Sequence, residues 1–276
     1  MLNTPAITIV TPSFNQAKFL GECLASVQAQ KIGSVEHLVF DGGSSDGSVE
    51  ILRSVGRGSL SSDMQWVSER DRGQSHAINK GFRVASGEMI GWLNADDRYR
   101  PNCLSAIVKA FHDHPNIDVI YGDYTWVDEE GTPLQLRREI AFSAFVLLYH
   151  RVLYIPTTAM FFRRRILDDG QLLNEDLHYA MDFEFFVRLS RLGYRFMHIS
   201  KVLADFRFHS ASKSVAFPER QLAEQKQITR QYSPILRKCS PRWASLILSG
   251  LRTAAALRRY SEKALRGYYF SQFQLM

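Results

Sequence analysis

An apolar segment of strand type ends at Asn94, and two adjacent carboxylates, Asp96 and Asp97, follow it before Pro101. Neighbouring like charges repel each other, so a cation must hold them or water must screen them. Hard oxygen ligands on a loop suit Mg²⁺ or Mn²⁺, which bind one or two carboxylates while phosphates and water complete the shell. A solvated acidic turn is the default for an isolated pair of aspartates, but the position at the end of an apolar strand favours a metal site.

Two further polar loops carry residues that could contact a nucleotide. Asp41 opens the loop DGGSSDGS, where it either builds a turn or offers an acceptor to a base N–H or a ribose hydroxyl. Arg72 precedes a helix start, whose amides and dipole favour anions, so it could pair with a phosphate or stack on a base. The alternative is a surface salt bridge among Glu69, Arg70, Asp71 and Arg72.

The segments that must position these loops alternate between strands and helices. Apolar residues at helical spacing predict helices that contain residues 19–27, 49–55, 76–87, 104–111 and 181–193, the first of them capped by Asn15. Apolar and β-branched runs predict strands over residues 7–11, 35–40, 64–69, 88–94, 118–127 (strand or hairpin), 157–164, 196–200 and 202–209. The region around 125–180 shows no reliable pattern.

This alternation indicates right-handed βαβ units in an α/β fold, with a mixed, mostly parallel central sheet flanked by helices. Ligands of such sheets bind beyond the carboxyl ends of the strands. Four polar loops should therefore meet at one edge of the sheet: residues 11–15, 41–48, 68–74 and 94–98.

Composition bounds the class of protein. The 276 residues, 45% of them hydrophobic, allow one large domain or a domain with an appendage. The net charge of +6 is a property of residues 226–266, with ten basic side chains and one acid, whereas residues 1–225 carry 24 basic and 27 acidic side chains. Nucleic-acid binding by the whole protein is therefore not expected. Three widely spaced cysteines and a start without a secretory pattern predict a cytoplasmic protein.

Four segments in this order resemble glycosyltransferase family 2, the inverting, nucleotide-sugar-dependent enzymes of the GT-A fold. They are TPSFNQAKFLGECLASVQAQ, DGGSSDGS, DRGQSHAINKGFRVASGEMIGWLNADD and MDFEFFVRLSRLG. The resemblance implies a GT-A, Rossmann-like catalytic domain over residues 1–215, followed by a basic amphipathic helical region over residues 216–276.

The resemblance also implies a role for each matching residue. Asp41 would accept a hydrogen bond from the base, and Arg72 would lie against base or phosphate. Asp96 and Asp97 match the metal-associated motif. Of the two, Asp97 is the one expected to bind Mn²⁺ or Mg²⁺ directly on the diphosphate. Many members carry an acid where this chain has Asn94, which bears on metal affinity. The remaining positions would line the nucleoside pocket (Pro12, Ser13, Phe14 and Asn15) or approach the diphosphate and metal (His209).

Asp182 falls where the family keeps its catalytic base, and Glu184 is the fallback. Two residues along a helix point in different directions, so only one of them can face the sugar. In the implied reaction the acceptor hydroxyl attacks the anomeric carbon opposite the nucleotide, and Asp182 takes the hydroxyl proton. The metal neutralises the negative charge that grows on the nucleoside diphosphate.

The implied donor is a UDP-, GDP- or dTDP-linked sugar, and the implied acceptor is a glycan or a lipid-linked molecule in surface polysaccharide, lipopolysaccharide or glycolipid synthesis. The tail lacks an uncharged apolar run of the ~18–20 residues that a spanning helix needs. Basic amphipathic helices can lie on anionic lipid, so we expect peripheral contact with the inner face of a membrane. The alternative is a helical appendage that packs on the catalytic domain or on a second subunit.

Two other functions remain open at this point. A catalytically silent nucleotide-sugar-binding or scaffold subunit would retain the loops yet tolerate loss of Asp182. A sugar-phosphate nucleotidyltransferase would show a Gly-rich, Arg- or Lys-bearing loop directly after the first strand, and TPSFNQ differs from that pattern.

Overall fold

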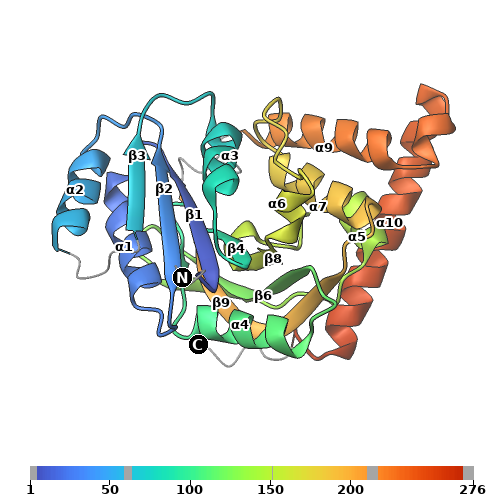
Figure 1. Ribbon diagram of the computed structural model, residues 1–276. Helices are drawn as coiled ribbons and strands as arrows, with labels where there is room; N and C mark the ends of the chain where they lie inside the picture. The colour runs from blue at the N-terminus through green and yellow to red at the C-terminus, as the bar shows by residue number, and fades with distance from the viewer. Residues whose placement is uncertain (1–4, 59–63, 151, 210–216, 270–276) are drawn as a thin grey trace.

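A computed structural model describes residues 5–58, 64–150, 152–209 and 217–269 (Figure 1). Its centre is one mixed sheet with the strand order β3-β2-β1-β4-β8-β6-β9-β5, and β7 pairs with β6 beside this path. The strands are β1 (Ile7–Ser13), β2 (Val35–Asp41), β3 (Met64–Ser68), β4 (Met89–Trp92), β5 (Arg98–Tyr99), β6 (Val119–Val127), β7 (Pro133–Arg137), β8 (Met160–Arg163) and β9 (Phe196–Arg207). The α-helices are α1 (Ala17–Gln28), α2 (Ser48–Gly58), α3 (Gln74–Val84), α4 (Cys103–Asp113), α5 (Ala144–Tyr149), α6 (Arg165–Asp168), α7 (Met181–Arg191), α9 (Pro218–Tyr232) and α10 (Pro241–Leu265), and the 3₁₀ turns are η1 (Thr157–Ala159) and η2 (Leu236–Lys238).

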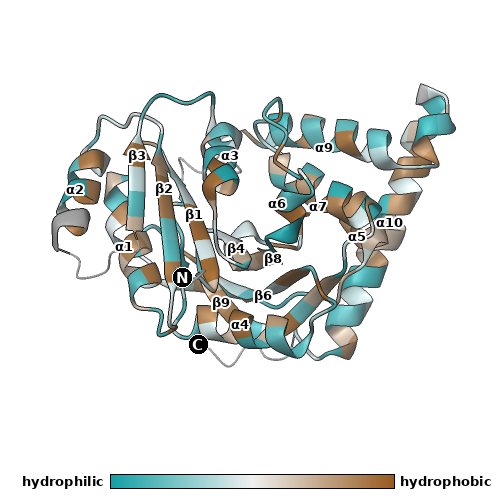
Figure 2. Cartoon of the chain, viewed as in Figure 1, coloured by the Kyte–Doolittle hydropathy of each residue, from teal (hydrophilic) through white to brown (hydrophobic). Residues whose placement is uncertain are grey.

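The first half of the sheet is parallel, as the sequence predicts. Strands β3, β2, β1 and β4 pair in parallel, and every residue of β1 is buried. Successive side chains of a strand point to opposite faces, so Ile7 and Ile9 pack with α1 and α4, whereas Val10 packs with α3. A Cβ on Gly81 of α3 would lie 2.4 Å from Val10 Cγ1, so only a glycine lets this helix approach the sheet so closely. The α/β fold class with helices on both faces is confirmed (Figure 2).

The second half of the sheet contains antiparallel pairs, and its strands differ from two of the strand predictions. β4 pairs antiparallel with β8, and β8 pairs antiparallel with β6. The two closing strands predicted over 196–200 and 202–209 are one strand, β9, which pairs in parallel with β6 and shifts register twice near Asp123. The strand predicted over 157–164 is shorter, because its first three residues form η1.

The prediction that Asn15 caps α1 was wrong. Gln16 is the N-cap residue, and Asn15 adopts a left-handed conformation with φ of 51°. The first amide of the helix, Ala17 N–H, donates instead to Asp46 Oδ2 at 2.8 Å, and Gln16 N–H donates to Ser48 Oγ at 3.1 Å. The loop after β2 therefore caps α1 from a distant part of the chain.

The two C-terminal helices share a core with the rest of the molecule. Ile228, Leu236, Ala244 and Ala255 belong to the hydrophobic cluster that contains the buried faces of α5 and α7. The boundary predicted between residues 1–215 and 216–276 falls in residues 210–216, outside the described residues. Among the described residues, none of the helices is long and apolar enough to cross a membrane.

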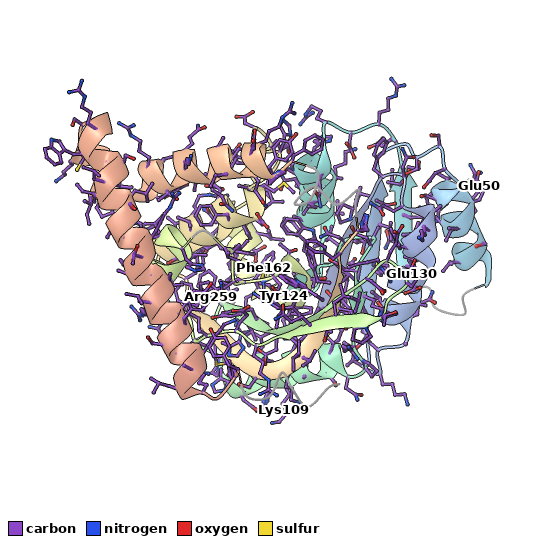
Figure 3. All side chains as sticks on the ribbon, turned by 180° about the vertical axis from the view of Figure 1, so that it is seen from behind. Glu50, Lys109, Tyr124, Glu130, Phe162 and Arg259 are labelled. Carbon is purple, nitrogen blue, oxygen red and sulfur yellow. The ribbon has the colours of Figure 1, made fainter. Side chains whose placement is uncertain are left out.

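A buried charge network also joins α10 to the sheet region. The Glu139 side chain is fully buried, and Arg259 Nη2 donates to both of its oxygens at 2.8 and 3.0 Å. Lys263 Nζ lies 3.0 Å from the same carboxylate. Figure 3 shows Arg259 directed from α10 toward the interior. Arg259 and Lys263, two of the ten basic side chains of residues 226–266, thus hold α10 against the rest of the protein.

Candidate active site

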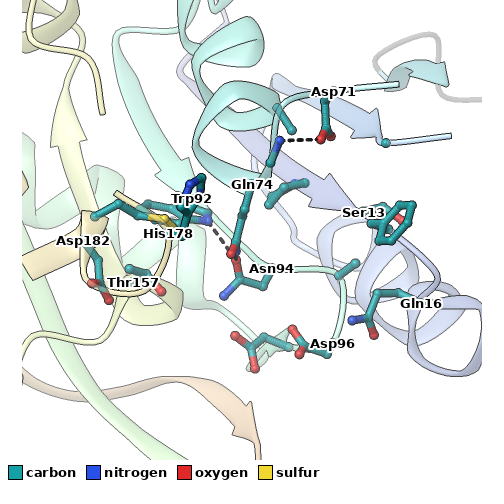
Figure 4. Close-up of a pocket in the computed structure, with 18 of the residues that line it drawn as sticks. Ser13, Gln16, Asp71, Gln74, Trp92, Asn94, Asp96, Thr157, His178 and Asp182 are labelled. Carbon is teal, nitrogen blue, oxygen red and sulfur yellow. Dashed lines mark hydrogen bonds between the residues drawn. The ribbon is translucent and has the colours of Figure 1, made fainter. Parts of the chain in front are cut away.

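A pocket of about 730 Å³ lies at the carboxyl ends of the parallel strands. Each of the four polar loops contributes to its lining, so the expectation that they meet at one edge is confirmed. Figure 4 shows Asp182 and Thr157 on one side of the pocket, Ser13 and Gln16 on the opposite side, and Asn94 and Asp96 between them. The lining residues are Pro12, Ser13, Phe14, Gln16, Gly42, Gly43, Arg70, Asp71, Gly73, Gln74, Ala77, Trp92, Asn94, Ala95, Asp96, Asp97, Thr157, His178, Tyr179, Met181, Asp182, Phe206 and Gln221.

The two adjacent carboxylates have different surroundings. Asp97 is 3% exposed, and its two oxygens accept hydrogen bonds from Arg207 N–H and the Thr158 hydroxyl, each at 2.9 Å. Burial first, and the charge of Asp96 second, raise the pKa of Asp97 well above its usual range. The Asp96 side chain is 20% exposed, so of the two it is the one open to a ligand.

Arg207 is a buried cation that lies beside this pair and binds the backbone of Asp96. It ends β9 and is almost fully buried, and its Nε donates to the Asp96 carbonyl at 3.0 Å. Its Nη2 lies 2.7 Å from Glu22 Oε2, which neutralises the buried guanidinium. Since Arg207 also donates its backbone N–H to Asp97, one residue joins the end of β9 to the acidic loop.

Asp96 and His209 could hold a divalent cation together, although His209 is not among the residues that line the pocket. His209 Nε2 lies 3.0 Å from Asp96 Oδ2, and the imidazole packs on Phe19 with 4.9 Å between ring centroids. Carboxylate and imidazole together suit Mn²⁺, and two protein ligands leave room for phosphate oxygens and water. Within the described residues, no group of three or more His, Cys, Asp or Glu side chains could hold a metal by itself. The donor set therefore fits a cation that is bound jointly with a diphosphate.

Asn94 occupies the position where many family members carry an acid. Its Oδ1 accepts hydrogen bonds from Trp92 Nε1 and Gln74 Nε2, both at 2.9 Å (Figure 4). These two donors fix the amide between the acidic loop and the start of α3.

The structure brings only part of the predicted nucleotide set to the lining. Pro12, Ser13 and Phe14 line the pocket, and the Phe14 ring is exposed. Asn15 and Asp41 do not line it. Asn15 Oδ1 accepts from Ser45 N–H, and Asp41 is buried. Its oxygens accept from the Gly43 and Ser44 amides and from the hydroxyls of Ser44 and Ser68. The turn role of Asp41 is therefore present, and its contact with a base stays a prediction.

Arg72 also lies outside the lining. Its guanidinium is 71% exposed and pairs with Glu175 at 2.5 Å, so its contact with base or phosphate stays a prediction. Its neighbours Arg70 and Asp71 do line the pocket. A Cβ on Gly42 would lie 2.7 Å from Asp71 Oδ2 and 3.2 Å from the Phe14 ring, so glycine keeps these groups close together. The sequence predicted that the loop over residues 68–74 contributes to the site. It did not show that Arg70, and not Arg72, lines the pocket.

Asp182 and Glu184 separate as their helical spacing requires. Asp182 lines the pocket from the first turn of α7, and its Oδ1 accepts from Phe183 N–H at 2.7 Å. Glu184 is buried away from the pocket, where it accepts from Arg188 Nε at 2.9 Å and from the Tyr232 hydroxyl at 2.5 Å. Of the two candidates for the base, only Asp182 reaches the cavity.

No sequence pattern pointed to the group that holds the loop before Asp182. Glu224 of α9 accepts hydrogen bonds from three successive backbone amides, His178, Tyr179 and Ala180, at 3.1, 2.9 and 2.8 Å. Ala180 is the N-cap of α7, so the carboxylate also lies at the positive end of the helix dipole. Gln221 of the same helix lines the pocket. The C-terminal region thus forms part of the site.

The family model described as "Glycosyl transferase family 2" matches residues 8–170, which is more than half of the chain. The chain belongs to this family. A glycosyltransferase of Mycobacterium tuberculosis is similar to it, with 30% identity over 190 residues that cover 68% of this chain and 70% of that protein.

Two further relatives are longer than this chain. A glycosyltransferase of Nostoc is 26% identical over 168 residues, which cover 59% of this chain and 52% of the relative. The chondroitin synthase of Escherichia coli is 24% identical over 219 residues, which cover 76% of this chain and 30% of the relative. The chain therefore spans about half the length of the first relative and less than a third of the second.

Two solved structures share the fold of this family 2 chain. Staphylococcus aureus TarS 1–349 in complex with UDP has a TM-score of 0.64 and 20% identity, covering 89% of this chain and 70% of that chain. The mannosyltransferase PcManGT from Pyrobaculum calidifontis, in complex with GDP-Man and Mn²⁺, has a TM-score of 0.64 and 19% identity, covering 98% and 81%. At this identity the likeness shows the fold, which is GT-A.

Proposed function

We propose that the protein is an inverting glycosyltransferase that moves a sugar from a nucleotide donor to a hydroxyl acceptor. The observation that carries this proposal is the placement of Asp182 across one cavity from Ser13, with Asp96 between them (Figure 4). A base and a diphosphate site on opposite sides of a bound sugar are what an inverting displacement requires.

The donor end of the pocket is the side formed by the loops after β1, β2 and β3. The exposed ring of Phe14 offers an apolar face for a base, and Arg70 offers a cation for the diphosphate. UDP is bound by TarS and GDP-Man by PcManGT, which supports a UDP-, GDP- or dTDP-linked sugar as the donor class here.

Asp96 and His209 would hold the cation, for which Mn²⁺ and Mg²⁺ are the candidates. PcManGT is in complex with Mn²⁺, which supports the same choice. Asp97, the direct ligand that the family resemblance implies, also lines the pocket, but each of its oxygens already accepts a hydrogen bond, from Arg207 N–H and from the Thr158 hydroxyl. Once bound, the cation supplies Lewis-acid stabilisation of the departing diphosphate.

In the proposed reaction, Asp182 acts on the acceptor and the loops on the opposite side of the pocket receive the leaving group. The acceptor hydroxyl approaches the anomeric carbon from the Asp182 side, and the carboxylate takes its proton as the new bond forms. General-base catalysis of this kind contributes on the order of 10²–10⁴-fold. The nucleoside diphosphate leaves toward Asp96 and the loop after β1, so the configuration at the anomeric carbon inverts.

The acceptor class we propose is a glycan or a lipid-linked molecule used in surface polysaccharide, lipopolysaccharide or glycolipid synthesis. The chondroitin synthase among the relatives supports a glycan acceptor. Since lipid-linked acceptors lie in membranes, we place the protein on the cytoplasmic side, with peripheral contact through its C-terminal helices.

The test of donor binding is a thermal-stability screen of UDP-, GDP- and dTDP-sugars with and without Mn²⁺ or Mg²⁺. A ligand that binds only the folded state raises the melting temperature. At a concentration of 100 times its Kd, the ligand adds about 2.7 kcal/mol to the free energy of unfolding. We expect one nucleotide class to stabilise the protein, and chelation or Asp96→Asn to reduce the effect. No stabilisation by any nucleotide would reject the proposal.

A further inference from the structure

We propose that the corner between α9 and α10 is a docking surface for an anionic lipid bilayer, which gives the proposed membrane contact a defined place. This surface, called here the 234–246 corner, comprises the exposed residues of that range. It lies outside the donor pocket, and binding there can be measured without any glycosyl transfer.

Large apolar side chains are exposed on this corner. Trp243 and Leu246 in the first turns of α10 are 65% and 67% exposed, and Ile235 is 45% exposed. On the neighbouring end of α7, Leu192 is 57% exposed. Farther along α10, Leu257 is 63% exposed, so the apolar side chains of this helix are not confined to the side that packs on α5. A tryptophan among aliphatic residues suits the boundary between lipid headgroups and acyl chains.

The charge of the corner has one sign. Arg237, Lys238 and Arg242 are exposed, and residues 234–250 contain no acid. The adjoining C-terminal half of α7 adds Arg191 and is also free of acids beyond Glu184. Within the part of the chain that the structure describes, no ion pair involves any of these four cations. Their charge is complementary to an anionic surface.

An apolar pocket of about 250 Å³ opens beside the same corner. It lies between α5, α7 and the segment before η2, and its walls include Phe145, Leu148, Val187 and Ile235, with Arg191 among its lining residues. A hydrophobic recess with a cation in its lining offers space for an acyl segment beneath an anionic headgroup. This second observation favours lipid over a flat protein partner.

Two cations of α10 are excluded from this docking surface because they are bound inside the protein. Arg259 and Lys263 are bound to the buried Glu139, so they cannot meet a membrane. Removing the whole tail would also open the core that α9 and α10 share with α7. Point variants of exposed residues are therefore the appropriate test.

The experiment measures co-sedimentation of the full chain with phosphatidylcholine vesicles and with phosphatidylcholine–phosphatidylglycerol vesicles. We expect binding only to the anionic vesicles. The triple variant Arg237→Gln, Lys238→Gln, Arg242→Gln should weaken it by about 100-fold, since each cation near an anionic surface contributes several-fold. Trp243→Ser with Leu246→Ser should also reduce binding. The matched controls, Lys31→Gln, Arg53→Gln, Lys109→Gln and the exposed Val84→Ser with Leu134→Ser, should bind like the wild type.

The outcomes are distinct. Failure of the wild type to bind anionic vesicles, or equal losses in the control variants, would overturn the proposal. So would a lipid-free dimer that Trp243→Ser with Leu246→Ser separates into monomers, because a second copy would then cover the corner. Nucleotide binding should be the same in every variant, so a failure here leaves the donor site standing, and a failed donor screen leaves the vesicle result standing.

Discussion

Asp182 and Glu184 show how position alone separates two like side chains. Both are in the first turn of α7, yet Asp182 lines the pocket while Glu184 is buried against Arg188 and Tyr232. Asp96 and Asp97 divide in the same way, one open to the cavity and the other bonded on both oxygens. In each pair, one acid is more open to the pocket, and the other is bonded into the loop or helix that carries it.

The arginines of the loop after β3 allow a test of the donor end. Arg70 lines the pocket, whereas Arg72 is turned toward Glu175. We expect Arg70→Ala to weaken binding of UDP or GDP by about 10-fold, the loss expected for one charge-assisted contact. Arg72→Ala should have a smaller effect, measured by isothermal titration on both variants. A larger loss in Arg72→Ala would mean that this side chain leaves Glu175 and carries the role that the sequence predicts.

At the scale of elements, α9 fixes the segment that carries the proposed base. Glu224 accepts three backbone amides in succession, and Arg220 Nη1 donates to the Tyr179 hydroxyl at 3.0 Å. A charged acceptor on amides at a helix N-terminus makes strong hydrogen bonds. Since this helix lies beyond the matched family segment, part of the rigidity of the site comes from outside it.

Glu224→Gln should therefore disturb catalysis more than donor binding. The amide has one acceptor oxygen for three N–H groups, so we expect turnover to fall about 10- to 100-fold through misplacement of Asp182. The nucleotide Kd should stay unchanged, and hydrogen exchange should quicken at residues 178–180. Glu219→Gln removes the same charge from an exposed position on α9 and serves as the control. Equal turnover in the two variants would contradict the role of Glu224.

The pairing of β1 with β2 buries an ionisable group with a defined effect on stability. His37 of β2 is buried against the Thr11 hydroxyl, and desolvation lowers its pKa from 6.5 to about 4. The unfolded chain therefore binds the proton more tightly. The stability is complete above pH ~6.5 and is lost as the pH falls toward 4, by about 3 kcal/mol in total.

Urea unfolding between pH 7.5 and pH 4 measures this loss. His37→Asn should remove the loss of stability that this imidazole contributes between pH ~6.5 and 4, whatever the effect of the substitution at neutral pH. His112→Asn, on the exposed end of α4, should leave the dependence as it is in the wild type. A wild-type slope retained by His37→Asn would show that another group is responsible.

At the scale of the whole molecule, the Glu139 network joins α10 to the catalytic part. Glu139→Gln leaves Arg259 and Lys263 buried without a counter-charge. Breaking a buried pair in this way costs roughly 3–5 kcal/mol, which urea unfolding would measure. Glu129→Gln removes an exposed pair with Lys18 and should cost about 0–1 kcal/mol. Similar values for the two variants would mean that α10 is held by apolar packing alone.

The sequence predicted most of the parallel half of the fold and three of the acids that line the pocket. Hydrophobic runs and helical spacing are local, so β1 to β4 and α1 to α4 were accessible, and so were Asp96, Asp97 and Asp182 through their motifs. The cap of α1 could not be predicted, because Asp46 accepts from Ala17 N–H across a long separation in sequence. The contact of Glu224 with residues 178–180 was inaccessible for the same reason, and so was the choice between Arg70 and Arg72. β5 has only two residues and no periodicity to detect.

The most direct test of the central claim compares donor binding and turnover in the wild type and in Asp182→Asn, using the donor that the stability screen identifies. We expect the variant to bind the nucleotide sugar with an unchanged Kd and to lose turnover by about 10²–10⁴-fold. Full turnover in Asp182→Asn would contradict the account, because the pocket would then bind the donor without this carboxylate acting as the base.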